Sequence, residues 1–160
     1  MDKFPLTFAI IKPHVVSNPV AFQRLQSIIS DNKFEVIRSK QVKLTEPILA
    51  EFYGEHRDKF FYNRLITFMR SGETQALILH KIDAITSWRN LMGPTKVFKT
   101  LYSHPESLRG QFGLSDTRNA CHGSDSVASV EKEVKIFFPD FNIHDWCTTS
   151  EFQAKQNRSR

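Results

Sequence analysis

Residues 119 to 138 read NACHGSDSVASVEKEVKIFF and place a single histidine between a run of small residues and a helical pattern. Residues 124 to 126 (SDS) have side chains that commonly cap helix N-termini. Apolar residues then recur at helical spacing from Val127 to Phe137. The stretch therefore predicts a helix that begins shortly after His122.

Apolar runs earlier in the chain predict three strands, at 7–11, 34–44 and 75–79. Capping residues, prolines and helical spacing predict helices around 18–32, 45–53, 65–69 and 83–92. Strands and helices therefore alternate along the chain, and we expect a fold that contains both.

Two segments lack a clear period. Residues 94–118 are dense in turn formers and in Arg and Lys, which predicts a long structured loop with one helical turn. The chain becomes polar and basic after Trp146, which predicts a frayed end. We therefore expect one domain over 1–141 and a polar, basic tail over 142–160.

The composition is that of a globular protein that attracts anions. The chain has 160 residues, of which 40% are hydrophobic, and this length suits a single core. A formal net charge of +5 fits nucleotides, nucleic acid and anionic lipid equally well. Charge alone therefore does not identify the ligand.

Cysteine usage and the first residues indicate an intracellular protein. Cys121 and Cys147 are too few for a disulfide framework, so we expect free thiols in a reducing compartment. No apolar run is long enough for a membrane span, and the start, MDKFPLTF, resembles neither a secretory nor an Arg-rich leader. Cytoplasm and mitochondrion both remain open.

His122 is the first candidate for chemistry. A lone histidine in a loop is more often solvated or hydrogen-bonded than catalytic. Here a helix N-terminus follows it, and free backbone N–H groups with the positive end of a dipole favour a phosphate. A neutral imidazole can also attack phosphorus without a separate base. Glu133 could reach back to orient the ring or Ser124, although a helix Glu more often pairs with a surface Lys.

Side chains must hold any phosphate, because the chain has neither a P-loop nor a dinucleotide-binding glycine motif. The candidate donors are Lys12, Arg89, Thr95, Arg109 and Arg118. Each cation alone is more often a solvated surface residue. Phe60 and Phe61 could stack on a base, although adjacent phenylalanines usually belong to a core. No second Cys or His pair completes a metal site with Cys121 and His122.

The sequence resembles the nucleoside diphosphate kinases over nearly the whole predicted domain. The matching stretches are TFAIIKP (7–13), EFYGEHRDKFFYNRL (51–65), LMGPT (91–95), LRGQFG (108–113) and RNACHGSDSVASVEKEVKIFF (118–138). The stretches LMGPTKVF, FGLSDTRN and FFPDF are most similar to the divergent type 6 branch. The resemblance implies a ferredoxin-like α/β (α+β) sandwich, in which helices cover an antiparallel four-stranded sheet.

The resemblance also implies a ping-pong reaction. ATP would give its γ-phosphoryl to His122, which would pass it to a nucleoside diphosphate. Tyr53, Ser124 and Glu133 match the residues around that histidine. The family's nucleotide contacts match Lys12, Phe61, Arg89, Thr95, Arg109 and Asn119. Because stacking and ribose contacts read no base edge, we expect a broad choice of nucleotide. Mg²⁺ would arrive with the nucleotide, so no dedicated metal site is expected.

Three departures from the family pattern open an alternative. His14 replaces the acid of K-P-D, Thr117 replaces a glycine, and the segment KVFKTLYSHPESL after Thr95 is longer than usual. The homo-oligomer implied by the resemblance is typically a hexamer, but these changes leave a dimer or monomer open. The alternative is a weakly active or inactive module that binds a nucleotide or protein partner, with the mitochondrial and apoptosis-linked role associated with type 6. A third hypothesis, salt-dependent nucleic-acid binding through the basic tail, has no specific motif.

Overall fold

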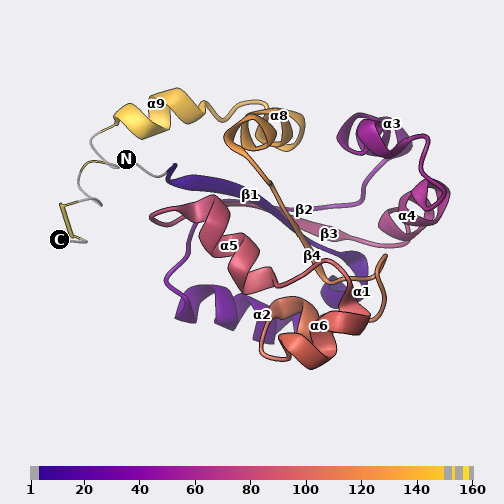
Figure 1. The fold of residues 1–160 in the computed structure, drawn as a ribbon. Helices are drawn as coiled ribbons and strands as arrows, with labels where there is room; N and C mark the ends of the chain where they lie inside the picture. The colour runs from indigo at the N-terminus through magenta and orange to yellow at the C-terminus, as the bar shows by residue number, and fades with distance from the viewer. Residues whose placement is uncertain (1–3, 150–152, 154–156, 159–160) are drawn as a thin grey trace.

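The computed structural model describes residues 4–149, 153, 157 and 158, and in this part the chain forms a four-stranded sheet with helices on both faces (Figure 1). The strands are β1 (Leu6–Ile11), β2 (Glu35–Val42), β3 (Thr74–His80) and β4 (Cys121–Gly123). Their order is β2-β3-β1-β4, and every neighbouring pair is antiparallel. The predicted four-stranded antiparallel fold class is confirmed.

The three longer strands lie where the apolar runs predicted them, whereas no sequence pattern indicated β4. A strand of three residues is too short to show the alternation that marks a strand. β4 pairs with β1 through Ala9, Ile10 and Ile11. His122 therefore lies in a strand, and not in the loop that we predicted.

The helices are α1 (Pro13–Val16), α2 (Pro19–Asp31), α3 (Glu46–Phe52), the 3-10 turn η1 (Gly54–His56), α4 (Tyr62–Met69), α5 (Ala84–Met92), α6 (Val97–Ser103), α7 (Leu108–Phe112), α8 (Val127–Phe137) and α9 (Ile143–Thr148). Asn18 caps α2 by accepting a hydrogen bond from the Ala21 backbone N–H at 3.2 Å. None of the helices in the described part of the chain is long and apolar enough to cross a membrane.

The segment 94–118 contains two helices, α6 and α7, where we predicted a long loop with one helical turn. Each helix has fewer than eight residues, so neither spans enough turns to produce a readable period. They are held by tertiary contacts instead: Val97 and Leu108 are buried, and the Asp116 carboxylate accepts a hydrogen bond from the Val97 N–H at 3.1 Å.

α9 lies in the region that we predicted to be frayed. Asn142 caps this helix through the Asp145 N–H at 3.0 Å, and Trp146 is buried in the core. Our prediction gave weight to the polar residues after Trp146 and neglected the apolar spacing of Ile143 and Trp146. Most of the remaining predicted tail (150–152, 154–156, 159 and 160) lies outside the described residues, and the boundary near residue 141 stays a prediction.

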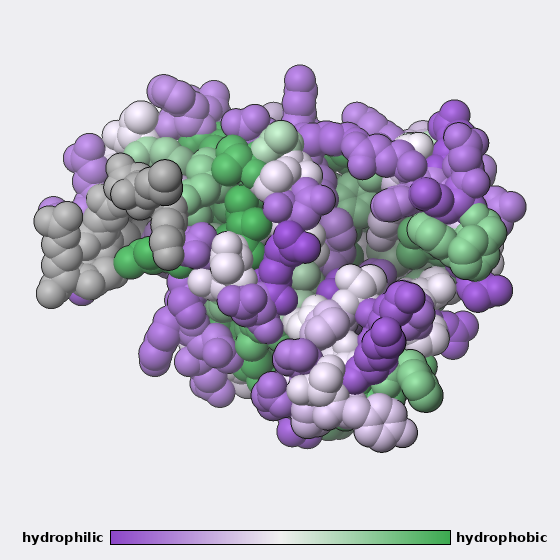
Figure 2. Space-filling view, viewed as in Figure 1, coloured by the Kyte–Doolittle hydropathy of each residue, from purple (hydrophilic) through white to green (hydrophobic). Residues whose placement is uncertain are grey.

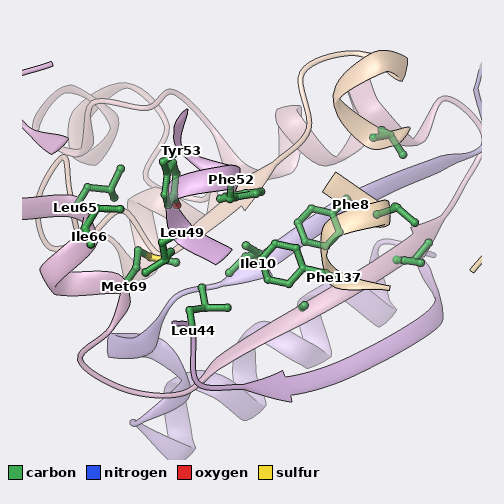
Figure 3. Close-up of a cluster of buried hydrophobic side chains, with 14 of the residues drawn as sticks. Phe8, Ile10, Leu44, Leu49, Phe52, Tyr53, Leu65, Ile66, Met69 and Phe137 are labelled. Carbon is green, nitrogen blue, oxygen red and sulfur yellow. The ribbon is translucent and has the colours of Figure 1, made fainter. Parts of the chain in front are cut away.

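The sheet separates two apolar cores. On the side of α3, α4 and α8, Phe8 and Ile10 pack among the side chains in Figure 3, and the ring centroids of Phe8 and Phe137 are 4.9 Å apart. On the side of α2 and α5, Ala9 and Ile11 pack with Trp88. Because successive side chains of β1 enter opposite cores, this strand is fixed in place. Its C-terminal end provides a rigid base for the candidate site.

Candidate functional site

The ladder between β1 and β4 brings the distant ends of the chain together. Ile10 is opposite His122, and Ile11 is opposite Cys121. Opposed residues in an antiparallel pair share a face, so the His122 side chain points to the core of Ile10, toward α3 and α8. The Lys12 backbone N–H donates to the Ala120 carbonyl at 2.9 Å, which places the end of β1 beside residues 119–122.

Glu133 links His122 and Ser124 in one hydrogen-bonded network. Its Nε2 lies 2.6 Å from Oε1 of Glu133, which comes from α8. The Ser124 hydroxyl donates to the other oxygen, Oε2, at 2.8 Å. Ser124 and Glu133 are buried, while the His122 side chain keeps 25% of its surface exposed. Glu133 thus reaches back to both residues and is not the exposed partner of a lysine.

Aromatic side chains hold the histidine in place. The Phe52 ring contacts the His122 imidazole nearly at right angles, with centroids 4.9 Å apart. Behind the strand, the Trp88 indole N–H donates to the His122 carbonyl at 3.1 Å. A Cβ on Gly123 would overlap the Trp88 ring. Gly123 therefore makes room for this indole.

The helix N-terminus contributes differently from our expectation. α8 begins at Val127, and the Ser126 hydroxyl accepts a hydrogen bond from the Ser129 N–H at 3.2 Å. That first-turn donor is therefore already satisfied by a cap. The tie between α8 and His122 runs through Glu133, in the middle of the helix.

The Tyr53 hydroxyl lies near Glu133 and has no hydrogen-bond partner among the described residues. The residue is buried. Burial raises the pKa of the Tyr53 phenol above its usual range, and the nearby Glu133 charge raises it further. The phenol is therefore a neutral group that can donate a hydrogen bond to a ligand.

Two buried cations lie beside β4. The Arg109 guanidinium donates to the Gly93 carbonyl at 2.9 Å and to the Cys121 carbonyl at 3.2 Å, and its Nε–H has no partner among the described residues. Lys12 Nζ makes one long hydrogen bond, to the Thr117 carbonyl at 3.4 Å. Burial, followed by the Arg109 charge, lowers the pKa of Lys12 to about 8. An anion bound here would offset both the burial of the Lys12 ammonium and its repulsion by Arg109.

Cys121 fits this environment as a neutral thiol. Burial raises its pKa to about 11, although the charges of Arg109 and Lys12 oppose the shift. Cys121 and Cys147 are both free, as the sequence predicted.

The remaining predicted nucleotide contacts are Asn119, Arg89, Thr95 and Phe61. Asn119 is buried, and its Oδ1 has no partner in the described structure. Arg89 is exposed on α5, and its charge acts on both Arg109 and Asp125. Thr95 is exposed, and Phe61 is half-buried just before α4. Within the described part of the chain, no hydrogen bond or ring contact joins Thr95 or Phe61 to the His122–Glu133 pair.

A surface hollow of about 650 Å³ lies between α4 and residues 114–118, and of the candidate residues, all within the described part of the chain, only Arg118 lines it. Phe68, Thr117 and Arg118 are among its lining residues. The Arg118 guanidinium lies over the Phe68 ring, 5.5 Å from its centroid, and both side chains line the hollow. Hydrophilic residues cover most of the face drawn in Figure 2. The hollow has the size of a small-molecule pocket.

The described residues contain no group of three or more His, Cys, Asp or Glu side chains that could hold a metal ion. At the end of β1 the buried charges are instead cationic, from Lys12 and Arg109. This arrangement suits an anion, and a metal ion would need oxygen ligands brought by that anion.

Comparison with known proteins identifies the family. The family model described as nucleoside diphosphate kinase matches residues 6–143. A nucleoside diphosphate kinase 6 of Xenopus tropicalis is 50% identical over 141 residues, covering 88% of this chain and 79% of the relative. The protein of the same name from Homo sapiens is 45% identical over 150 residues, covering 94% and 81%. These matches confirm the resemblance to the type 6 branch.

Solved structures agree with these matches. The nucleoside diphosphate kinase of Aquifex aeolicus has a TM-score of 0.77 at 33% identity, covering 84% of this chain and 94% of that one. A halophilic nucleoside diphosphate kinase from Halobacterium salinarum, in complex with CDP, has a TM-score of 0.76 at 29% identity, covering 83% and 86%. Sequence and fold thus give the same answer, and the chain belongs to the nucleoside diphosphate kinase family.

Proposed function

We propose that the protein transfers the γ-phosphoryl of ATP to nucleoside diphosphates through a phosphohistidine at His122. The observation that carries the proposal is the contact between His122 Nε2 and Glu133. A carboxylate accepts, so Nε2 carries the hydrogen and Nδ1 keeps its lone pair. The imidazole is then a nucleophile that needs no separate base.

In the first half-reaction, Nδ1 attacks the γ-phosphorus, an N–P bond forms, and the bond to the β-phosphate oxygen of ATP breaks. The ring gains positive charge, which Glu133 stabilises while Ser124 holds its carboxylate. In the second half-reaction, a β-phosphate oxygen of a different nucleoside diphosphate attacks the same phosphorus. The N–P bond breaks, and the neutral ring returns.

The unsatisfied groups support a phosphate-bearing substrate. Arg109 Nε–H and the Tyr53 hydroxyl are buried donors without partners in the described structure. Buried polar groups are normally paired, so these are candidates to bind a ligand. Lys12, Arg89 and Arg109 would balance the charge of the phosphates, Asn119 and Thr95 would contact the ribose and phosphates, and Phe61 would stack on the base. The CDP bound to the halophilic relative supports this class of ligand.

Mg²⁺ belongs to this proposal as part of the substrate. The cationic surroundings of Lys12 and Arg109 lack a carboxylate ligand set, so the nucleotide's own phosphate oxygens would hold the ion. There it would neutralise phosphate charge.

The alternative, a module that acts by binding a partner, draws on one specific observation. On α6, Phe98 and Tyr102 expose 75% and 80% of their surfaces. These residues lie in the segment whose length departs from the family pattern. As part of this alternative, we propose an assembly smaller than a hexamer, a cytoplasmic or mitochondrial setting and a role in apoptosis.

A labelling experiment tests the leading proposal. The protein is mixed with Mg²⁺ and ATP labelled at the γ-phosphate, and acid-labile, base-stable label is measured before and after a chase with unlabelled nucleoside diphosphate. We expect label that appears and then leaves with the chase. Label that stays would mean that the second half-reaction is absent. Nucleotide binding without label would favour the binding module.

Tyr53→Phe should change stability and activity in opposite directions. Removing a buried hydroxyl without a partner is expected to raise the free energy of unfolding by about 1 kcal/mol. The same change removes a buried donor near Glu133 that we assign to the phosphates, so the transfer rate should fall about tenfold. Chemical denaturation and steady-state rates check the two effects. A rate that stays at the wild-type level would assign Tyr53 to the core alone.

A further inference from the structure

His14 makes a contact that its family counterpart, an acid, could not make. It follows Lys12 and Pro13 and lies in α1, and its Nε2 is 3.0 Å from the Phe112 carbonyl oxygen. A carbonyl only accepts hydrogen bonds, so Nε2 must donate. An aspartate here would instead set an acceptor against an acceptor.

The contact ties down the C-terminal end of α7, a helix too short to be stable on its own. α7 has five residues and ends at Phe112, so its last carbonyls have no partner within the helix. At its N-terminal end, the Ser107 hydroxyl caps the helix by accepting from the Gly110 N–H at 3.0 Å. At the C-terminal end, the Gly113 N–H donates to the Arg109 carbonyl at 2.9 Å, and His14 holds the Phe112 carbonyl.

The same helix carries Arg109. Its guanidinium spans the Gly93 and Cys121 carbonyls, and Cys121 is the neighbour of His122 in β4. A shift of α7 would therefore move the cation relative to His122. Phosphoryl transfer is sensitive to such shifts, because positioning supplies much of its rate.

The His14 ring is itself fixed from the other side. It is part-buried and packs against Phe68 of α4, with centroids 5.6 Å apart. The Arg118 guanidinium covers the same Phe68 ring. His14 thus joins α1, α4 and α7 at one point behind the surface hollow.

We propose that His14 is a positioning residue, which holds α7 in place and through it keeps Arg109 aligned for the phosphates. This inference rests on the proposed function, because Arg109 is assigned to phosphate there. It concerns a residue that stands where the K-P-D pattern has an acid.

Acid should loosen the packing of the His14 ring, because protonation puts a buried charge on it, although Nε2 continues to donate to the Phe112 carbonyl. Nδ1 is buried without a partner among the described residues, and the charges that act on the ring, Lys12 at the end of β1 and Arg118 before β4, are both positive. Burial, and then these charges, lower the pKa of His14 below the usual 6.5, although the Phe112 contact opposes this. The unfolded chain therefore takes up the proton first, so the contribution of His14 to stability is complete above pH 6.5 and declines below it.

Two variants separate the donor from the ring. His14→Gln keeps an N–H at the position of Nε2, whereas His14→Phe keeps a ring and loses the donor. His104→Gln, at an exposed histidine between α6 and α7, is the matched control. Four quantities are measured: kcat and KM for transfer from ATP to a nucleoside diphosphate other than ADP, the dissociation constant of ADP by calorimetry, and hydrogen exchange of residues 108–112 without nucleotide.

We expect His14→Phe to speed exchange in α7 and to raise KM and Kd by about ten- to a hundredfold. His14→Gln should stay near wild type and lose less protection from exchange in α7 than wild type between pH 6.5 and 5. Equal behaviour of the two variants, or unchanged exchange in both, would overturn the proposal. If the wild type never transfers phosphate, the proposed function fails, but exchange and ADP affinity still decide whether His14 positions α7.

Discussion

His122→Gln is expected to abolish the acid-labile label and to lower γ-phosphoryl transfer by about 10⁴-fold or more. The side-chain N–H of glutamine can occupy the position of Nε2, where it can still donate to Glu133 as His122 does. The variant therefore keeps the buried carboxylate satisfied and loses only Nδ1. Without that lone pair, no phosphoenzyme can form, and ping-pong transfer has no route.

The measurement is the labelling assay, run beside thermal unfolding and nucleotide binding. His144→Gln is the matched control, because His144 is exposed on α9 and the substitution is identical. We expect the control to label normally and His122→Gln to bind nucleotide without labelling. Label that persists in His122→Gln would assign the phosphoryl group to another residue. Loss of nucleotide binding or of folding would show that the ring has a structural role as well.

The local features of the site could be predicted from the sequence, because they follow from short-range rules. Residues 124 to 126 and the apolar spacing after them located α8. The position of Glu133 on that helix suggested a contact with His122 or Ser124, and the structure contains both contacts. The family resemblance supplied the assignment of Lys12 and Arg109, which no local pattern could supply.

The missed features depend on long-range pairing. β4 exists because β1 offers it an edge, and its three residues carry no pattern of their own. α6 and α7 are too short to be read from periodicity, and contacts such as Asp116 with Val97 fix them. The tie between His14 and Phe112 joins residues 98 positions apart. Only the folded chain brings such groups within hydrogen-bonding distance.

Arg109→Ala should have the second largest effect, because Arg109 combines two roles. Its guanidinium satisfies the Gly93 and Cys121 carbonyls, and leaving these unpaired is expected to cost about 1–3 kcal/mol of unfolding free energy. Its remaining Nε–H and its charge would act on the transferring phosphoryl group, and their loss should lower kcat by about 10²–10³-fold. Stability and rate should therefore fall together.

Arg109→Lys separates the two roles. Lysine keeps the charge but has one compact ammonium group in place of the planar fork, so it cannot span both carbonyls and still donate to a phosphate. We expect partial recovery of stability and a rate that stays at least about tenfold below wild type. Arg24→Ala, which removes one exposed charge from α2, controls for net charge. A wild-type kcat in Arg109→Lys would mean that charge alone suffices. A wild-type kcat in a destabilised Arg109→Ala would restrict Arg109 to holding the Gly93 and Cys121 carbonyls together.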